Sequence, residues 1–334
     1  MSELVKVAVD AMGGDNAPFE IVKGAVEAVC ESDRIKVFLV GQEASVKAEL
    51  EKYTYDKARI EVVPASEVIT NNEHPAEAIK NKPDSSIVVA QRMVKDGLAD
   101  AFVSAGSTGA VLVGGQLIIK KLKGVKRAPL APVIPTKKGV SLLIDCGANM
   151  DPRPEHLVSF ARMGAIYMEE VIGKPNPTVA LVNVGAEDEK GNALVKETMP
   201  LLKACEDIHF VGSIEARDIP KGDADVIVCD AFTGNVILKM YEGVASVMFS
   251  EIKKSLMASL KTKIGALLIK PSLKQMVVKF DASEYGGAPM LGLNGLVVKS
   301  HGSSKAKDIR ICILKCIAYT QNHVSDKISA HLNP

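Results

Sequence analysis

A strand that turns directly into a helix is the arrangement around which this sequence is organised. The β-prone run Val226–Cys229 predicts a buried strand, and the apolar run Val236–Met240 predicts the start of a helix. Between them stand Asp230, Thr233, Gly234 and Asn235. The first N–H groups of a helix have no partner inside it, so such a junction can hold an anion. Taken alone, Asp230 and Thr233 could equally be ordinary cap residues, with Gly234 making room for the turn.

The same order of strand, glycine-bearing polar loop and helix recurs along the chain. Strands are expected at Leu4–Val9, Ile35–Val40, Ile60–Val63, Ala99–Val103, Val140–Ile144, Thr178–Val182 and Ile208–Val211, in addition to Val226–Cys229. Strands that alternate with helices form parallel sheets through right-handed crossovers. The loops should therefore gather at one edge, the carboxyl ends of the strands.

Five of these loops carry residues suited to binding an anion. The candidate substrate-binding residues are Asp10, Gly13, Gly14, Asp15, Ser104, Gly106, Ser107, Thr108, Gly109, Asn149, Asn183, Glu187, Asp230, Thr233 and Gly234, with Lys190 as a fixed positive charge. Glycines and small hydroxyls let phosphate approach backbone N–H groups closely. Each loop alone fits a turn-and-cap interpretation better, but five at one edge favour a site for a small anionic molecule.

Neither nucleotide fingerprint is present in these loops. The stretch Ser104–Gly109 matches neither G-x-x-x-x-G-K-[ST] nor a G-x-G-x-x-G after the first strand. A nicotinamide-dependent dehydrogenase is accordingly disfavoured.

Two later stretches add candidates. Glu284–Gly295 is glycine-rich and apolar, so Gly286 and Gly287 could line an acyl pocket or belong to a tightly packed crossover. His301, just before the expected final helix, could contact substrate or be a hydrogen-bonded structural histidine.

A basic amphipathic segment is expected as a helical hairpin at residues 250–281. Between Ile252 and Phe280 there are seven lysines and no acidic residue. At helical spacing one stripe contains Phe249 and the candidate membrane-binding residues Ile252, Leu256, Leu260, Ile264 and Leu267. Pro271 is expected to end this helix. The hairpin suits an anionic membrane surface, an acidic protein partner or a dimer contact.

Composition narrows the class of protein. The chain has 334 residues, 47% of them apolar, and a formal net charge of +1 with 4% aromatics and no Trp, which argues against nucleic-acid binding. Its six cysteines and six histidines show no metal-ligand spacing, so no metal is expected. We expect a single cytoplasmic α/β domain, residues 1–334, because there is no linker, secretory segment or membrane-spanning run.

The assembled stretches closely resemble the bacterial phosphate acyltransferase (PlsX) family over nearly the whole length. The matching stretches are Val7–Asp15, Ser104–Ala110, Asp145–Asn149, Leu181–Glu187, Lys190–Asn192, Asp230–Leu238, Tyr285–Ala288 and His301–Ser304. Ser107 stands where the family usually has Asn, and Ala231 where it usually has Gly.

The resemblance implies transfer of a fatty acyl group from acyl carrier protein to inorganic phosphate, without a cofactor, for phospholipid synthesis. It also implies a three-layer α/β/α sandwich like the isocitrate and isopropylmalate dehydrogenases, and a homodimer. Such a protein would sit peripherally on the inner face of the cell membrane and supply acyl phosphate to a membrane acyltransferase.

Phosphate is itself an oxyanion nucleophile, so we expect direct transfer, with Lys190 and Asn235 as the catalytic residues that polarise the reacting groups. Asp230 would then orient Lys190 or loop N–H groups, and Cys229 is expected to be a core residue. The alternative is a non-catalytic scaffold that binds lipid or acyl carrier protein.

Overall fold

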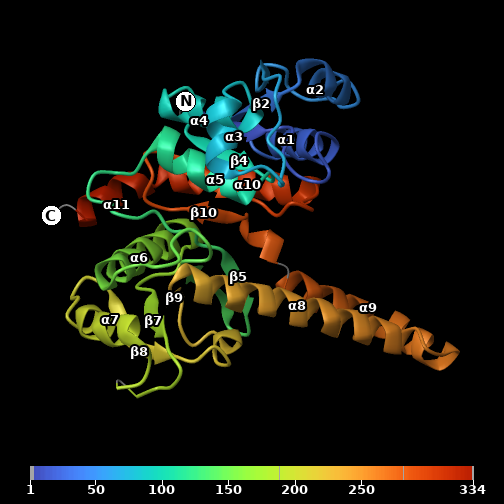
Figure 1. Ribbon diagram of the computed structural model, residues 1–334. Helices are drawn as coiled ribbons and strands as arrows, with labels where there is room; N and C mark the ends of the chain where they lie inside the picture. The colour runs from blue at the N-terminus through green and yellow to red at the C-terminus, as the bar shows by residue number, and fades with distance from the viewer. Residues whose placement is uncertain (1–3, 188, 281, 333–334) are drawn as a thin grey trace.

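Two β-sheets, shown one above the other in Figure 1, form the framework of the protein. The computed structural model describes residues 4–187, 189–280 and 282–332. The first sheet has the order β10-β11-β4-β1-β2-β3 and the second the order β5-β6-β9-β7-β8. Only the pairs β10–β11 and β5–β6 are antiparallel among the described strands, so the expectation of mainly parallel α/β structure is confirmed.

The six-stranded sheet is the middle of three layers. Its strands are β1 (Val5–Asp10), β2 (Ile35–Gly41), β3 (Ile60–Pro64), β4 (Ala101–Ser104), β10 (Ala288–Met290) and β11 (Leu296–Lys299). One face, with Val7 and Val9, packs on α1 (Phe19–Glu31) and α10 (Ala306–Gln321). The other, with Ala8 and Phe38, packs on α3 (Pro75–Asn81), α4 (Ser86–Lys95) and α5 (Thr108–Gly114). Successive strand residues point to opposite faces, so these apolar strands are covered on both sides.

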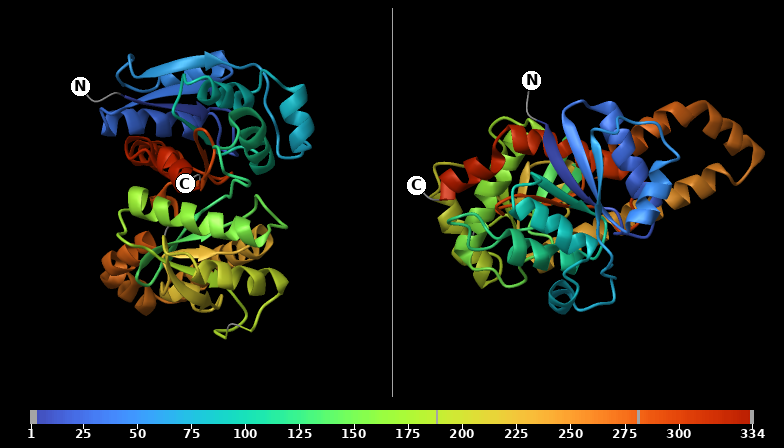
Figure 2. Two further views of the ribbon diagram at one scale, coloured as in Figure 1. Left: turned by 90° about the vertical axis from the view of Figure 1, so that its left-hand side faces the viewer. Right: turned by 90° about the horizontal axis from the view of Figure 1, so that it is seen from above.

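The five-stranded sheet is layered in the same way (Figure 2). Its strands are β5 (Val133–Thr136), β6 (Gly139–Ile144), β7 (Thr178–Val182), β8 (His209–Ile214) and β9 (Val226–Val228). Helices α6 (Pro154–Tyr167) and α7 (Ala193–Lys203) cover one face, and the start of α8 (Ala231–Leu256) covers the other. One apolar cluster contains Val7 of the first sheet and Val226 of the second, so the two sheets share a core.

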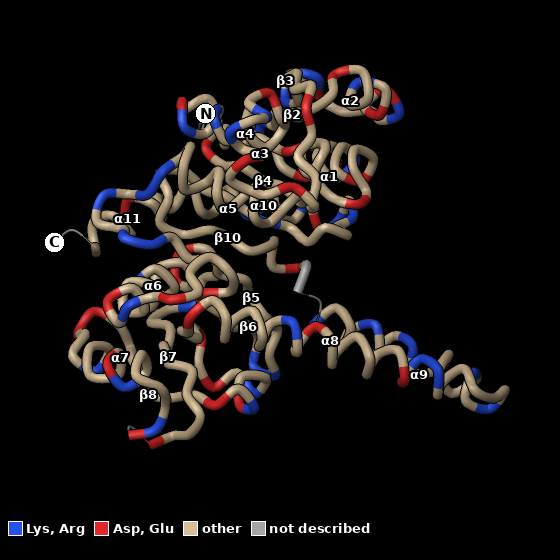
Figure 3. Tube along the Cα trace, viewed as in Figure 1, with Lys and Arg blue, Asp and Glu red and all other residues tan. Residues whose placement is uncertain are grey.

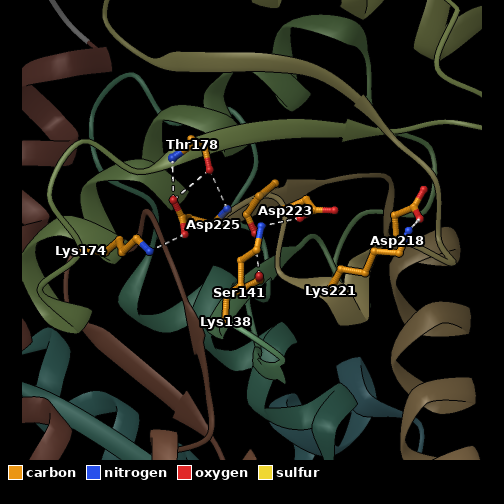
Figure 4. A network of polar contacts seen from close by, with 9 residues as sticks. Lys138, Ser141, Lys174, Thr178, Asp218, Lys221, Asp223 and Asp225 are labelled. Atoms are coloured by element: carbon orange, nitrogen blue, oxygen red, sulfur yellow. Dashed lines mark hydrogen bonds and ion pairs between the residues drawn. The ribbon is translucent and has the colours of Figure 1, made fainter.

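Asp225 fixes the strand that leads into α8. Its carboxylate accepts hydrogen bonds from the N–H and hydroxyl of Thr178, each at 2.9 Å, and pairs with Lys174 at 3.1 Å (Figure 4). Ser141 on the other neighbouring strand donates to the carbonyl of Ala224 at 2.6 Å. These contacts hold β9 between β6 and β7 and thereby set where Asp230 begins α8.

The sequence predicted eight of the described strands and missed three. Each expected strand is present, with its bounds shifted by at most a few residues. The strands β5, β10 and β11 were not predicted. Both β5 and β10 are edge strands that contain a proline, Pro135 and Pro289, and proline is tolerated only where its missing N–H is not needed.

The helical hairpin is present, but its bounds differ from those expected. It consists of α8 and α9 (Leu260–Lys279), which project from the body as a pair (Figure 1). The turn lies at Met257–Ser259, where Ser259 and Thr262 form a capping box. Pro271 lies inside α9, so the expectation that it ends a helix was wrong. The expected end of the hairpin, Asp281, lies outside the described residues.

The remaining helices are α2 (Glu43–Leu50) and α11 (Val324–Leu332). Shorter turns occur at Gly115–Ile119, Met168–Ile172, Ile219–Lys221 and Ala282–Tyr285. None of the helices in the described part of the chain combines the length and the hydropathy that a membrane crossing requires.

A glycine at the start of α8 gives the first testable prediction. A Cβ on Gly234 would lie 1.9 Å from the carbonyl oxygen of Asp145, which is backbone and cannot rotate away. Gly234→Ala should therefore destabilise the fold by about 1–3 kcal/mol or more, measured by urea denaturation. Gly243 lies on the same helix with nothing near its missing Cβ, so Gly243→Ala should be neutral or stabilising by up to about 1 kcal/mol. Equal stabilities of the two variants would contradict this packing.

Candidate functional site

The loops after β1 and β4 are tied together by a buried carboxylate. Asp10 ends β1 and accepts a hydrogen bond from the hydroxyl of Ser104 at 2.7 Å. The same hydroxyl accepts from the N–H of Gly106 at 2.9 Å. A Cβ on Gly13 would lie 2.7 Å from the backbone nitrogen of Gly106, so the two loops are in close contact. Burial raises the pKa of Asp10, while hydrogen bonds and the charge of Lys299 act in the opposite direction.

A third loop, after β11, joins this pair. The N–H of Asp15 donates to the carbonyl of Gly302 at 2.8 Å. Gly14 has φ of +101°, a conformation that favours glycine, and a Cβ there would lie 3.0 Å from the same carbonyl. Ser107 caps α5 by accepting from the N–H of Ala110 at 3.4 Å. Loops that are distant in sequence therefore meet beside Thr108 and His301.

The loops of the second sheet are also held by side-chain caps. Asp230 is the N-cap of α8, accepting from the N–H of Thr233 at 2.9 Å and from its hydroxyl at 2.6 Å. Asn149 is buried and donates to Asp145 at 2.6 Å and to the carbonyl of Ala128 at 3.1 Å. Of the two duties expected for Asp230, the structure supports orienting loop N–H groups.

A cleft of about 440 Å³ lies between the two sheets. Thr108, Lys299 and His301 line it from the first sheet, and Asn235 and Lys239 line it from the second. Its polar lining also includes Ser300, Ser304, Glu242 and Asp308, and its apolar wall includes Leu130, Pro132, Val133, Cys146, Leu238 and Ala288. One cavity thus offers positive charge and hydroxyls beside an apolar surface, a combination suited to a molecule with an anionic and an apolar part.

Two lysines that the sequence analysis missed carry the positive charge. Lys299 ends β11 and is only 8% exposed. Burial lowers the pKa of Lys299 to about 8, and the Asp10 carboxylate acts against that shift. Lys239 lies one helical turn after Asn235 on the same face of α8 and pairs with Glu242 at 2.8 Å. The sequence contained one signal for Lys299: it is a charged residue directly after the apolar run Leu296–Val298.

Not every expected residue reaches this cleft. The five loops divide between two sheets and do not share one sheet edge, so that part of the prediction was wrong. Lys190 follows β7, is about half exposed and pairs with Glu187 at 2.8 Å. The amide of Asn183 donates to the carbonyl of Lys190 at 3.3 Å and so orders this loop. The carboxylate partner of Lys190 is therefore Glu187, and of the two roles expected for Asp230 the one toward Lys190 is not seen.

Three expected glycines divide between packing and the cleft. A Cβ on Gly109 would lie 2.4 Å from Pro75, so this glycine brings α5 onto α3. Gly286 packs in the same way against the side chain of Lys315 of α10. Gly287 lines the cleft, where a Cβ would lie 2.9 Å from the carbonyl of Lys299.

His301 lines the cleft with an exposed ring. Its Nδ1 lies 2.8 Å from the hydroxyl of Ser303 and accepts from the N–H of that residue at 3.3 Å. The two sequence interpretations, substrate contact and structural hydrogen bonding, are therefore compatible.

Cys229 lies in the core. Its side chain is 3% exposed, and burial raises the pKa of the thiol well above its ordinary value. A thiol that stays protonated is a poor nucleophile, so the geometry is that of a packing residue.

Family and sequence comparisons agree on one family. Residues 5–327 match the model of a family described as fatty acid synthesis protein. A phosphate acyltransferase of Clostridium novyi is 49% identical over 328 residues, covering 98% of each chain. A phosphate acyltransferase of Alkaliphilus oremlandii is 50% identical over 325 residues, covering 97% of this chain and 96% of the other.

Solved structures share the fold at low sequence identity. A phosphotransacetylase from Streptococcus pyogenes superposes with a TM-score of 0.61 at 18% identity, covering 96% of this chain and 95% of its own. A 4-hydroxythreonine-4-phosphate dehydrogenase from Salmonella typhimurium gives 0.51 at 13% identity, covering 95% and 99%. The expected α/β fold related to dehydrogenases is thereby confirmed.

Proposed function

The chain belongs to the fatty acid synthesis protein family, whose members include phosphate acyltransferases, and from this we propose that it transfers a fatty acyl group to inorganic phosphate. The acyl donor in this proposal is acyl carrier protein, and the product is an acyl phosphate for phospholipid synthesis. The observation that carries the proposal is the cleft between the sheets. It presents Lys239, Lys299 and hydroxyls to an anion and an apolar wall to an acyl chain.

The reaction requires the protein mainly to position the reactants and to stabilise the charge that develops. An oxygen of phosphate attacks the thioester carbonyl, an acyl–oxygen bond forms, and the carbon–sulfur bond breaks with release of thiolate, which then takes up a proton. Phosphate is already ionised and thiolate is a good leaving group, so no serine or cysteine nucleophile is required. What remains is to hold the reactants together and stabilise the tetrahedral oxyanion.

Asn235 and Lys190 are the proposed donors to the reacting oxygens. Asn235 lines the cleft near the start of α8, where its amide can reach a bound substrate. Lys190 comes from the loop after β7, the strand next to β9, and in this structure its ammonium is held by Glu187. For Lys190 to act, substrate oxygens must replace Glu187 as its partner.

The decisive experiment measures release of free thiol from acyl–acyl carrier protein with and without phosphate. We expect release that depends on phosphate and that yields acyl phosphate in equal amount. A set of acyl chain lengths should be used because the cleft does not define the preferred length. A protein that binds the acyl carrier but releases no thiol at any length would instead be a scaffold.

Variants of the proposed donors give a second prediction. Asn235→Ala and Lys190→Ala should each lower kcat by about 100-fold or more, the usual effect of removing an oxyanion donor. Cys229→Ser is the control and should keep kcat within about 3-fold, because the buried thiol takes no part. Unchanged turnover in Lys190→Ala would exclude a catalytic role for that residue.

We also propose that the tip of the hairpin contacts an anionic membrane. Leu260, Ile264 and Leu267 on α9 are 75%, 56% and 70% exposed. Ile252 on α8 is 38% exposed, and Leu256 is half-buried. The turn at Met257–Ser259 places Ile252 and Leu256 on α8 and the other three residues on α9. The five residues therefore do not form the single stripe that was expected. The hairpin also carries mainly lysine among its charged residues (Figure 3), which suits acidic lipid head groups.

A second apolar stripe, on α8, supports a homodimer. Phe232, Val236, Met240, Val244 and Met248 recur every four residues, and each is at least 49% exposed. A row of exposed apolar side chains along a helix is a typical surface for self-association. The proposed assembly is therefore a dimer attached peripherally to the inner face of the membrane, where a membrane acyltransferase would receive the acyl phosphate.

Vesicle sedimentation tests the membrane proposal. Leu260→Glu should reduce binding to vesicles containing anionic lipid by about 10-fold, because a carboxylate replaces an exposed leucine at the tip. Leu117→Glu is the matched control, since Leu117 is 61% exposed but lies outside the hairpin. Both variants should sediment as dimers in solution. Equal vesicle binding by the two variants would remove the tip from the contact, and a monomeric wild type would remove the dimer.

A further inference from the structure

Lys299 is a buried cation that forms no ion pair with any residue the structure describes. It stands opposite Ser104 in the parallel pairing of β11 with β4 and is 8% exposed. Its ammonium donates a hydrogen bond to the carbonyl of Ser300. Among the described residues, no carboxylate lies within 4.0 Å of it. Removing an ammonium from water is costly unless an anion compensates the charge, so this position is suited to an anionic ligand.

The groups around Lys299 leave the ligand side open. The nearby Asp10 is already engaged by the hydroxyl of Ser104 and the N–H of Met12. The hydroxyls of Ser300 and Ser304 lie 2.7 Å apart on the wall of the same cleft. Lysine and hydroxyl groups facing one cavity form a set of donors that a phosphate oxygen can accept from.

A second cation faces Lys299 from the other sheet. Lys239 of α8 lines the same cleft, and its charge lowers the pKa of Lys299. Lys239 is 55% exposed and pairs with Glu242, so water and a carboxylate already compensate its charge. The two lysines therefore differ in strength as anion contacts, and the buried one is the stronger.

We propose that Lys299 binds the phosphate nucleophile in the cleft between the two sheets, with Lys239 as a weaker contact from the opposite side. The inference rests on the proposed acyl transfer to phosphate and adds to it the residue that holds the phosphate. Lys299 is distinct from Lys190, which follows β7 and does not line this cleft.

The first arm of the test compares phosphate use by wild type, Lys299→Met and Lys299→Arg at saturating acyl donor. A hydrogen bond to a charged group typically corresponds to about 10- to 100-fold in binding, so Lys299→Met should raise the KM for phosphate by that factor. The KM for the acyl carrier should change by less than about 3-fold, and Lys299→Arg should recover most of the phosphate affinity. Lys239→Met should raise the KM for phosphate by about 3-fold or less.

Direct binding separates a phosphate contact from a general loss of activity. Phosphate should raise the melting temperature of the wild type and of Lys138→Met, an exposed lysine paired with Asp223 that serves as a control. Phosphate should leave the melting temperature of Lys299→Met nearly unchanged. Circular dichroism shows whether Lys299→Met is folded. If it is not, the pH profile of Lys299→Arg, described next, carries the test.

The pH profile supplies a readout that a structural role would not alter. Below its pKa of about 8 Lys299 is protonated and binds phosphate; above it the charge is lost, so the phosphate KM of the wild type should rise from about pH 8 upward. Lys299→Arg should not show this rise. The other titratable groups that face this region are common to both proteins, so they cannot cause a difference between the two profiles. These groups are Asp10, Asp15, Lys239, Glu242, His301, Asp308 and Cys312.

Two negative results have different meanings. In the first, the wild type is active, but the Lys299 variants keep the phosphate KM, the thermal protection by phosphate and the pH profile of the wild type. This result would overturn the role of Lys299 and leave the proposed function in place. A wild type without phosphate-dependent thiol release would overturn the proposed function on which it rests.

Discussion

The close packing of Gly234 against the carbonyl of Asp145 is the contact on which the working parts of this protein depend. It fixes the start of α8 against the loop after β6, and the Asp230 cap fixes its direction. The whole of α8, from Ala231 to Leu256, has 26 residues, which corresponds to about 39 Å. The same helix therefore carries Asn235 and Lys239 in the cleft at one end and leads to the exposed hairpin tip at the other.

Placing the cleft between two sheets has an electrostatic consequence. Each sheet contributes one lysine, and neither lysine would face a second cation if the sheets were separate. Because Lys299 is buried and Lys239 is half exposed, the field in the cleft is strongest on the side of β11. The apolar wall, which includes Val133 and Leu238, lies mainly on the other sheet, so the anionic and apolar ends of a substrate would be received by different halves of the protein.

Local signals in the sequence predicted what is determined locally. The Asp230–Thr233 cap and the central strands depend on neighbouring residues, and the apolar runs and cap residues identified them. The hairpin turn was also signalled, by Ser259 and Thr262, but Pro271 was given more weight although an exposed helix can hydrate the carbonyl that proline leaves unpaired. The sequence held only a weak local signal for Lys299, because its position beside Ser104 and near Asp10 depends on residues far away in sequence.

The separation of Lys299 from Asn235 and Lys190 has a reason in catalysis. A cation that neutralises phosphate stabilises the ground state as much as the transition state, so it improves binding without accelerating the chemical step. Acceleration requires donors aimed at the oxygen on which charge develops, the thioester carbonyl. The proposed scheme, in which Lys299 binds phosphate while Asn235 and Lys190 polarise the carbonyl, therefore assigns the two requirements to groups that do not compete.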